Sequence, residues 1–600
     1  MVTVTRSLLD FTRVFDVLSY QRDRYPNSKS LNDKEKSQWK ASSIYVLQDK
    51  IDGMSAWLLK SGLTKGDTII FIPMAGSTAW MILDFACQQI GLISVIVHPT
   101  LTEKEIIRII QEADSTLVIC DTSDWYEAHR TSFNSLLNSI SFYHLDEHKP
   151  GYFTAFVTNQ FFETQLNDIR HLSDDVLPED TFCIMYTSGS TGQSKGVMLT
   201  HANVVHNIKA ILNILPLKSS FRVLSFLPFS HIFERVSCYA YMAFGVSVYF
   251  SRSKDDFKKD FQSVRPHCCT SVPRVLEKMY EYVENKTFSS SRITRKVVDW
   301  ALMIGSKFGD SASQSFYYPI QLFIARQLVL YRWRRALGNH IQFIVVGAAT
   351  LRSDIGRLFT SGGIRIIEAY GMTEMAPIIT INRVEPGLQK WGTVGIAIPG
   401  VELHIDKIED KEEGEIWVRG PNLMQGYYHN SALTESVITA EGWFQTGDVG
   451  KIIENRFLQI TDRKKDIFKT SSGKYIAPMP LQNLFTRSPY IERCLILGFQ
   501  RPFVTALLVP NFELVEIWCE QNAVLFTSPE YMVHNIKVRA LFDMDIDRLN
   551  QEVASHERVR NYVLCPQDWT VENGEMTATL KPIRDSLITH YQKAIEDMYS

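Results

Sequence analysis

The sequence predicts an α/β protein in which a large N-terminal body of helix-covered β-sheets, with a small β-barrel-like part, precedes a small mobile C-terminal α+β domain. Short apolar runs alternate with stretches of helical periodicity along most of the chain, a pattern typical of parallel strands covered by helices. At 600 residues the chain is too long for one compact core. A charge-dense segment, residues 461–473, separates the body from the residues that follow it.

Individual elements follow from the spacing of apolar residues. Residues 68–73 (TIIFIP) predict a buried strand, residues 75–90 have helical spacing, and residues 92–97 (LISVIV) predict the next strand. Residues 117–120 and 343–346 have the same strand character. This order of strand, helix and strand is the basis of the α/β assignment.

The domain boundaries follow from changes in pattern. Residues from about 274 to 337 contain three stretches of helical periodicity and predict a helical insertion. After Lys411 the chain becomes β-rich with turn residues, which predicts the barrel-like part. We therefore divide the chain into an N-terminal domain (1–461), a hinge (462–466) and a C-terminal domain (467–600).

Composition excludes several classes of protein. The apolar fraction is 45% and the charged fraction 22%, which is ordinary for a globular protein and excludes a largely disordered, collagen-like or coiled-coil chain. The net charge of −3 gives no overall basic footprint, so we expect no nucleic-acid partner.

The cysteines and the N-terminus indicate a cellular compartment. The nine cysteines form no C-x-x-C pair, which indicates free thiols in a reducing environment and no cysteine-based metal site. The N-terminal residues lack the pattern of a signal peptide, and the most apolar stretch is interrupted by polar residues. We therefore expect a cytoplasmic protein.

The strongest local signal is a loop rich in glycine, serine and threonine, residues 186–196 (YTSGSTGQSKG). Backbone N–H groups of such a loop converge on an anion, so a nucleotide triphosphate is its natural ligand. It is not a Walker A motif, because Lys195 lies between Ser194 and Gly196. Thr200 is a good N-cap for the next helix. The residues expected to bind phosphate are Thr187, Ser188, Gly189, Ser190, Thr191, Gly192 and Lys195.

This loop resembles the phosphate loop of the adenylate-forming enzymes, a superfamily of acyl-CoA synthetases, luciferases and peptide-synthetase adenylation domains. The family usually has proline where this chain has Ser194. The resemblance extends over roughly residues 40–595 and is greatest to the AMP-forming long-chain fatty-acid–CoA ligases.

Further segments resemble motifs of this family and occur in its order. Residues 227–235 (LPFSHIFER) resemble a segment of the long-chain members, which implies that His231 lies between the nucleotide and acyl sites. The YGxTE motif (370–374) implies that Tyr370 stacks on adenine and that Glu374, with Thr187, binds Mg²⁺. The residues implied to contact the nucleotide in this part are Gly347, Ala348, Ala349, Glu368, Ala369, Tyr370, Gly371, Met372 and Thr373.

The C-terminal part carries the remaining motifs. By the same resemblance, Asp448 of the TGD motif holds the ribose hydroxyls and Arg463 reaches the ribose or a phosphate. Lys465 is the pivot of the hinge, Gly473 helps to form the channel for CoA, and Lys581 is the catalytic lysine of the TxTxKxxR ending.

One more position departs from the family pattern. The segment after the hinge usually continues with an apolar residue and Glu, whereas here Leu481 is followed by Gln482. The change removes a charge.

The resemblance implies a two-step reaction with ATP and CoA as co-substrates and Mg²⁺ as cofactor. A fatty-acid carboxylate attacks the α-phosphate of ATP and expels pyrophosphate, and the CoA thiol then attacks the acyl carbon and releases AMP. Residues 238–248 (CYAYMAFGVSV) are candidates to line an apolar acyl tunnel. The residues implied to be catalytic are Lys581, Lys195, Thr373, Glu374 and His231.

Alternative functions and contacts stay open at this point. A fatty acyl-AMP ligase would pass the acyl group to an acyl-carrier protein, and a silent homologue would only bind acyl groups or nucleotide. Residues 317–337 mix aromatic residues with four arginines, which fits either peripheral contact with the inner face of a membrane or a solvated basic face on a packed helix. The sequence does not specify an oligomeric state.

Overall fold

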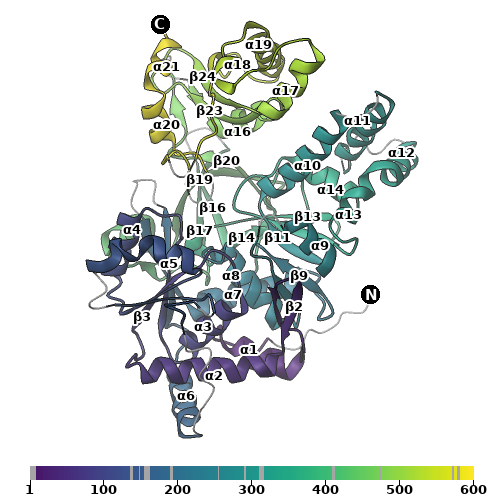
Figure 1. Cartoon of the computed structure of the whole chain (residues 1–600). Helices are drawn as coiled ribbons and strands as arrows, with labels where there is room; N and C mark the ends of the chain where they lie inside the picture. The colour runs from purple at the N-terminus through teal and green to yellow at the C-terminus, as the bar shows by residue number, and fades with distance from the viewer. Residues whose placement is uncertain are drawn as a thin grey trace. The chain divides into compact units, whose positions relative to one another are not determined.

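Two large sheets form the scaffold of the first of two compact units, which comprises Met1–Met279, Lys296–Leu403 and Val418–Phe444 (Figure 1). The second unit comprises Tyr280–Arg295, His404–Trp417 and Gln445–Ser600. The computed structural model describes residues 9–135, 140–147, 149–153, 163–188, 194–253, 256–288, 292–309, 316–407, 412–471, 474–570, 573–577 and 581–600.

One sheet of the first unit has nine strands among the described residues. Its centre is parallel, and antiparallel pairs lie at both ends, where β1 pairs with β2 and β13 with β14. In spatial order the strands are β15 (Ile396–Ala397), β14 (Ile378–Ile381), β13 (Arg365–Gly371), β12 (Phe343–Val346), β11 (Cys268–Ser271), β9 (Arg222–Ser225), β10 (Ser247–Phe250), β1 (Leu31–Glu35) and β2 (Gln38–Ser42).

The other sheet has seven strands within the described part of the chain. Its strands β3, β4, β5 and β7 are parallel because helices connect them, whereas β7 and β8 form an antiparallel hairpin. In spatial order the strands are β18 (Gly426–Tyr427), β8 (Ser194–Thr200), β7 (Thr181–Ser188), β4 (Ile93–Ile96), β3 (Thr68–Ile72), β5 (Leu117–Cys120) and β6 (Ser141–His144).

Helices cover these sheets, and the helical segment that the sequence predicts near residues 274–337 contains α10–α13 with a π-helical turn; its part Tyr280–Arg295 belongs to the second unit. The helices are α1 (Asp16–Arg24), α2 (Ile44–Lys60), α3 (Thr78–Gln89), α4 (Glu103–Glu112), α5 (Ser123–Arg130), α6 (Glu163–Asp175), α7 (His201–Ile214), α8 (Ile232–Ala243), α9 (Phe257–Val264), α10 (Pro273–Phe288), α11 (Arg292–Ser306), α12 (Tyr318–Ala325), the π-helical turn η4 (Arg326–Leu330), α13 (Tyr331–Ala336), α14 (Ser353–Ser361) and α15 (Ser431–Val437). Short 3₁₀ turns are η1 (Ser132–Ser135) and η5 (Thr373–Met375).

The α/β fold class is confirmed, and the predicted strands at residues 68–73, 92–97, 117–120 and 343–346 correspond to β3, β4, β5 and β12. The expectation of parallel sheets needs correction, because both large sheets are mixed. In the seven-stranded sheet the β7–β8 hairpin causes the difference, because β8 runs antiparallel to β7 before α7 begins.

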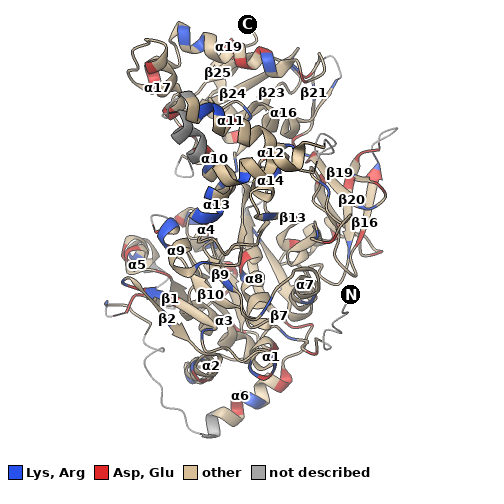
Figure 2. Cartoon of the chain, turned by 90° about the vertical axis from the view of Figure 1, so that its right-hand side faces the viewer, with Lys and Arg blue, Asp and Glu red and all other residues tan. Residues whose placement is uncertain are grey.

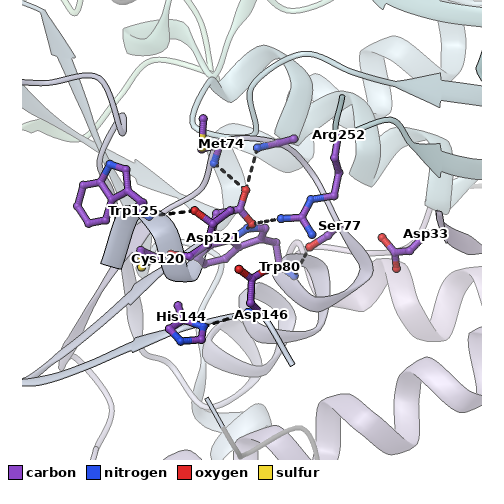
Figure 3. A network of polar contacts seen from close by, with 12 residues as sticks. Asp33, Met74, Ser77, Trp80, Cys120, Asp121, Trp125, His144, Asp146 and Arg252 are labelled. Atoms are coloured by element: carbon purple, nitrogen blue, oxygen red, sulfur yellow. Dashed lines mark hydrogen bonds and ion pairs between the residues drawn. The ribbon is translucent and has the colours of Figure 1, made fainter. Parts of the chain in front are cut away.

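A buried carboxylate joins the two large sheets (Figure 3). Asp121, just after β5, accepts a hydrogen bond from the indole Nε1 of Trp80 (3.1 Å) and forms an ion pair with Arg252 (2.6 Å), which follows β10 of the other sheet. Nearby, Asp33 of β1 accepts from the backbone N–H of Thr78 at the start of α3 (3.1 Å). Burial raises the pKa of both carboxyl groups. These contacts connect the carboxyl ends of β5 and β10.

The second unit contains most of a four-stranded sheet and a separate α+β part. The sheet consists of β16 (Glu402–Lys407), β17 (Gly414–Arg419), β19 (Phe444–Ile453) and β20 (Phe457–Arg463). The α+β part has the strands β21 (Phe468–Lys469), β22 (Tyr475–Ile476), β23 (Ile491–Leu497), β24 (Val504–Pro510) and β25 (Val559–Leu564). Its helices are α16 (Pro478–Phe485), α17 (Phe512–Gln521), α18 (Pro529–Met532), α19 (Ile536–Asn550), α20 (Arg584–His590) and α21 (Gln592–Asp597).

Alternating residues of β23 and β24 build two cores in this unit. Ile496 and Ala506 belong to a cluster with α16 and α19, whereas Leu495 and Leu507 belong to a cluster with α20 and α21. This alternation is the two-residue period of a strand that is covered on both faces.

Two further observations concern the whole sequence or all described helices. Each of the nine cysteines is a free, buried thiol. Of the helices in the described ranges, none combines the length and the apolar character needed to cross a membrane.

Candidate active site

The phosphate loop connects the two strands of the β7–β8 hairpin. Thr187 pairs with Lys195, and Ser188 pairs with Ser194, so the ends of the loop are held by the antiparallel ladder. Thr200 caps α7 through a capping box with Asn203, as its sequence position predicts. The predicted ligands Gly189, Ser190, Thr191 and Gly192 lie outside the described residues, as does the side chain of Ser188.

Helix α4 holds the second end of this loop through a contact that the sequence motif does not indicate. The backbone N–H of Ser194 donates to Glu105 Oε1 (2.8 Å), and the carbonyl oxygen of Ser194 accepts from Arg108 (2.9 Å). Arg108 also forms an ion pair with Glu105 (2.8 Å). Partial burial acts to raise the pKa of Glu105, but Arg108 and Ser194 outweigh it, so the pKa is lowered and the carboxylate stays ionised. Proline at position 194 would have no N–H for this bond.

A lysine, a tyrosine and a glutamate lie together beside the hairpin. The Lys195 Nζ atom lies 5.2 Å from the ring centroid of Tyr427, at the end of β18. The Tyr427 hydroxyl donates to Glu374 Oε1 (3.0 Å). Burial, with the Glu374 charge, raises the pKa of Tyr427 far above its usual value, so the hydroxyl remains a donor. The cluster offers a cation and an oriented carboxylate next to a loop of anion-binding composition.

The turn that carries Glu374 is fixed by backbone contacts. Gly371 lies so close to the next strand that a Cβ atom would be 1.9 Å from the carbonyl oxygen of Pro377, so only glycine fits. Asn207 of α7 donates to the carbonyl of Met375 (3.1 Å) and accepts from the N–H of Ile378 (2.9 Å). The turn is thus held from the side of α7.

The carboxyl ends of β12 and β13 bring together the residues predicted to surround adenine. A Cβ atom on Gly347 would lie 3.4 Å from the Ala369 carbonyl oxygen and 3.5 Å from the Phe233 ring, so the backbone approaches both closely. Ala348 has a left-handed φ of 69°. Tyr370 is buried in β13, while Ala348 and Ala349 are exposed.

Glu368 of β13 has a carboxyl group that is buried next to this loop. Only 5% of the residue is exposed, and its Oε1 atom has no hydrogen-bond partner among the described residues. Burial raises its pKa to about 8, so the group is protonated at neutral pH. A neutral carboxyl can donate as well as accept a hydrogen bond.

His231 is the N-cap residue of α8 and lies beside a second histidine. The ring centroids of His231 and His98 are 5.3 Å apart. His98 Nδ1 accepts from the N–H of Thr100 (3.3 Å), which assigns the proton of the neutral ring to Nε2. Burial and the neighbouring His231 lower the pKa of His98 to about 3. The pair therefore carries at most one positive charge at neutral pH.

Adjacent charges of α8 attach this helix to both sheets. Glu234 accepts hydrogen bonds from Ser225 of β9 and Thr270 of β11, and burial raises its pKa to about 7. Arg235, also fully buried, forms an ion pair with Asp84 of α3 and donates to Ser94 of β4 (2.7 Å). The Glu-Arg sequence after His231 therefore positions the helix between the sheets.

A small apolar cavity of about 10 Å³ lies against α8. It is far smaller than the ~300–1,000 Å³ typical of ligand pockets. Phe233, which packs against Gly347, is at its edge, so the cavity begins near the predicted adenine loop. Of the candidate tunnel segment 238–248, Tyr241 lines it. The lining residues are Ile211, Leu215, Phe233, Ser237, Tyr241, Thr270, Val345, Ile378 and Ile381.

In the second unit, Asp448 and Arg463 face each other across β19 and β20. They are register partners, and Arg463 Nε lies 3.2 Å from Asp448 Oδ1. The TGD turn is held by Glu415 of β17, which accepts from the N–H of Gly447 (3.1 Å) and pairs with Lys464 (2.8 Å). Glu415 is a supporting residue that the motif did not indicate.

The predicted hinge has a buried start and an exposed centre. Asp462 is 1% exposed and accepts from the N–H of Met479 (3.1 Å), and burial raises its pKa to about 6. Lys465 is exposed, and Gly473 lies outside the described residues. Gln482 of α16 accepts from the N–H of Ile496 through Oε1 (3.1 Å), so the amide has a structural contact at this departure from the family pattern.

Lys581 lies at the end of a tight loop in the second unit. Its N–H donates to Thr577 Oγ1 (3.0 Å), and its carbonyl accepts from the N–H of Thr577 (2.8 Å). Burial and the positive charge of Arg463 lower the pKa of Lys581 to about 8, while Asp448 opposes the change. The structure therefore brings Asp448, Arg463 and Lys581 into electrostatic contact within this unit.

The two groups of predicted residues suit nucleotide chemistry without a protein-only metal cage. Among the described residues, no cluster of three or more His, Cys, Asp or Glu could hold a metal ion. Glu374 supplies one oriented carboxylate, which fits Mg²⁺ because this ion is usually bound by one or two carboxylates, water and substrate phosphates.

Comparisons with known proteins agree with this arrangement. Residues 18–428 match the AMP-binding enzyme family, and residues 465–600 match the AMP-binding enzyme C-terminal domain. The long-chain-fatty-acid–CoA ligase FadD15 of Mycobacterium bovis is 28% identical over 94% of this chain and 93% of its own length. The long-chain-fatty-acid–CoA ligase 5 of Rattus norvegicus is 27% identical over 94% of this chain and 84% of its own length.

A similar fold is found among solved structures. The ATP-bound MatB from Rhodopseudomonas palustris has a TM-score of 0.72 and 20% identity, over 98% of this chain and all of the MatB chain. The o-succinylbenzoate CoA synthetase MenE of Bacillus subtilis, solved with an acyl-adenylate intermediate, has a TM-score of 0.66 and 18% identity over 95% of this chain and 97% of its own. At this identity the likeness concerns the fold.

Proposed function

Because the chain belongs to the AMP-binding enzyme family, we propose that it is an AMP-forming long-chain fatty-acid–CoA ligase. Its substrates are then a fatty acid, ATP and CoA. Relatives named long-chain-fatty-acid–CoA ligase support this proposal, since their similarity extends over 94% of this chain. The observation that carries it is the cluster of Lys195, Tyr427 and Glu374 beside the phosphate loop.

The first step joins two anions, so its catalysis consists mainly of positioning and charge neutralisation. The fatty-acid carboxylate attacks the α-phosphorus of ATP, the bond to the β-phosphate oxygen breaks, and pyrophosphate leaves. Lys195 and Thr187 bind phosphate oxygens, and Glu374 would hold Mg²⁺. When bound, the ion would supply charge neutralisation at the phosphates. The ammonium of Lys581 binds the carboxylate and the α-phosphate, a task for a compact point charge.

Nucleotide recognition is assigned to two groups of residues. Tyr370 and the Gly347–Ala349 loop bind the adenine ring, and Asp448 accepts hydrogen bonds from the ribose hydroxyls. Arg463 is paired with Asp448, which orients that carboxylate. His231 and apolar residues near Phe233 are assigned to the acyl group.

In the second step the CoA thiolate attacks the acyl carbon and the bond to AMP breaks. We propose that the C-terminal domain turns about Lys465 between the steps and that Gly473 contributes to the CoA channel. No covalent bond to the protein forms in either step. Lys581 is then needed only for adenylation.

The proposal is tested by pyrophosphate release with ATP, Mg²⁺ and fatty acids of two to twenty carbons, with and without CoA. CoA-dependent turnover that is greatest for long chains supports it. Release that stops after one equivalent, whether CoA is present or not, would instead favour transfer to an acyl-carrier protein. Absence of release with every acid would contradict an adenylating activity on fatty acids and favour a silent homologue.

A further inference from the structure

Helix α12 exposes large apolar side chains on the face that a surface helix normally gives to polar residues. We call this surface the α12 face. Its residues are exposed by 43–86% and comprise Phe316, Tyr317, Ile320, Phe323, Ile324 and Leu328. A contiguous set of this size is unusual on a soluble protein and marks a contact surface.

The opposite side of the same helix is also apolar and is already used for packing. Tyr318, Leu322 and Ala325 are buried, and the Tyr318 hydroxyl donates to the Ile304 carbonyl of α11 (3.1 Å). The α12 face therefore has no role in the core of the unit. A helix that is apolar all round requires an apolar environment on both sides.

The π-helical turn η4 keeps the exposed stripe on one side of the helix. It adds one residue to a turn, so Val329 and Leu330 are both buried. The buried positions then continue at Trp333 in α13. The outward positions continue at Arg332 and Arg335, which are exposed. The stripe is thus apolar in α12 and cationic in α13.

Charge along this segment of the chain has one sign. The sequence has no Asp or Glu between Asp310 and Asp354. In Figure 2, α12 is tan and α13 is blue, so the uncharged helix is followed by the arginines. Arg326 of η4 donates to the Ser361 carbonyl (2.6 Å) and is directed toward the protein. Arg332 and Arg335 are exposed cations that follow the α12 face in the same helical segment.

This pattern fits the surface of an anionic bilayer. An interfacial helix places apolar side chains among the upper acyl chains and its cations at the phosphate groups. Helix α12 has eight residues, too few to span the hydrocarbon core. A protein partner would have to be both apolar and acidic, and nothing in the described structure provides such a segment.

We propose that the α12 face, together with Arg332 and Arg335, binds the surface of a membrane that contains anionic phospholipids. Binding is peripheral: the apolar side chains enter the interface and the two guanidinium groups contact lipid phosphates. The proposal does not depend on the reaction assigned above. It places the protein where fatty acids partition.

Flotation of the full-length protein with vesicles tests the proposal. The wild type is mixed with neutral phosphatidylcholine vesicles or with vesicles that contain 30% phosphatidylglycerol. We expect binding to the anionic vesicles that weakens as salt rises. Ile320→Ser/Phe323→Ser/Leu328→Ser should reduce the partition coefficient at least tenfold. Arg332→Gln/Arg335→Gln should reduce it by about fivefold per charge on anionic vesicles only.

A matched control removes three exposed apolar side chains of the second unit, in Leu525→Ser/Tyr531→Ser/Met544→Ser. This variant should bind vesicles like the wild type. Absence of wild-type binding, or binding by the α12 triple variant equal to that of the wild type, would overturn the proposal. So would light scattering that shows a dimer for the wild type and a monomer for the triple variant. Pyrophosphate release with octanoate in lipid-free buffer should be equal for all variants, which separates this result from failure of the proposed reaction.

Discussion

The hydroxyl of Tyr427 donates a hydrogen bond to the carboxylate of Glu374 across 3.0 Å, although the two residues are 53 positions apart in the chain. The same tyrosine ring lies 5.2 Å from the ammonium of Lys195. Tyr427 therefore contacts both the cation that we assign to phosphate and the carboxylate that we assign to Mg²⁺.

Removing this hydroxyl should weaken the use of Mg-ATP. Tyr427→Phe removes one hydrogen-bond donor from Glu374, and a hydrogen bond to a charged group contributes about 1.5–3 kcal/mol. We expect kcat/KM for Mg-ATP to fall roughly tenfold, and Glu374→Gln to cost more. Steady-state kinetics of pyrophosphate release measure both. Tyr428→Phe, at the neighbouring position, is the control and should change little. Unchanged kinetics in Tyr427→Phe would show that Glu374 needs no such support.

The phosphate loop should respond to loss of a single backbone N–H. Ser194→Pro removes the donor to Glu105, whereas Ser194→Ala retains it. We expect the proline variant to have a lower thermal midpoint and a several-fold higher KM for ATP. The alanine variant should resemble the wild type. Glu105→Gln should have a smaller effect in the proline background than alone, because the bond is already absent. Additive effects of the two substitutions would contradict the contact.

The rate of adenylation should fall as pH rises through about 8. Burial and Arg463 lower the pKa of Lys581 to about 8, so half of the ammonium groups are neutral at that pH in the free enzyme. Lys581→Arg should lose activity at neutral pH but show no such decline, because arginine remains charged. Measuring the rate of pyrophosphate release between pH 6.5 and 9.5 gives the pH profiles of the wild type and of Lys581→Arg.

The same lysine should matter for only one half-reaction. Lys581→Ala should abolish adenylation and spare thioester formation from supplied acyl-AMP. Measuring CoA thioester from acyl-AMP provides the comparison, and equal loss of both activities would refute this division.

The buried carboxyl of Glu368 should make stability depend on pH. Its pKa is about 8 in the folded protein against 4.5 for an ordinary glutamate side chain, so the folded state holds one more proton between these values. Stability should therefore fall as pH rises from about 5 to 8 and level off above that. Glu368→Gln should abolish the loss of stability that this carboxyl causes. Its free energy of unfolding should exceed that of the wild type by a few kcal/mol at pH 8.5 and by almost nothing at pH 5. Thermal melts at both pH values test this, with exposed Glu435→Gln as the control. A gain of equal size at both values would point to a cause other than titration.

Apolar runs were sufficient to predict the central strands of both sheets, because a buried parallel strand is apolar along its whole length. β3 and β12 are examples. Strand β8 could not be predicted in the same way: its sequence SKGVMLT starts with polar residues and contains a glycine, and it becomes a strand by pairing with β7. The hairpin is thus a result of tertiary pairing.

The motifs assign residues to the proposed substrates, but they do not indicate the residues that support these in the structure. Tyr427, Glu105 and His98 stand in no recognised pattern, and their contacts connect segments far apart in the chain. Their roles depend on packing, which a local pattern does not specify. The assignments of Thr187, Asp448 and Lys581 to ATP remain predictions until a nucleotide complex or the kinetics above are available.

The burial of all nine thiols has a practical consequence. A maleimide dye added to the native protein should find no reactive sulfur, so a cysteine introduced on the outside of each unit would be the only site of labelling. Two such positions, one in each unit, would report the distance between the units by energy transfer without removal of any native cysteine. The proposed rotation about Lys465 could then be tested in real time as ATP, fatty acid and CoA are added in turn.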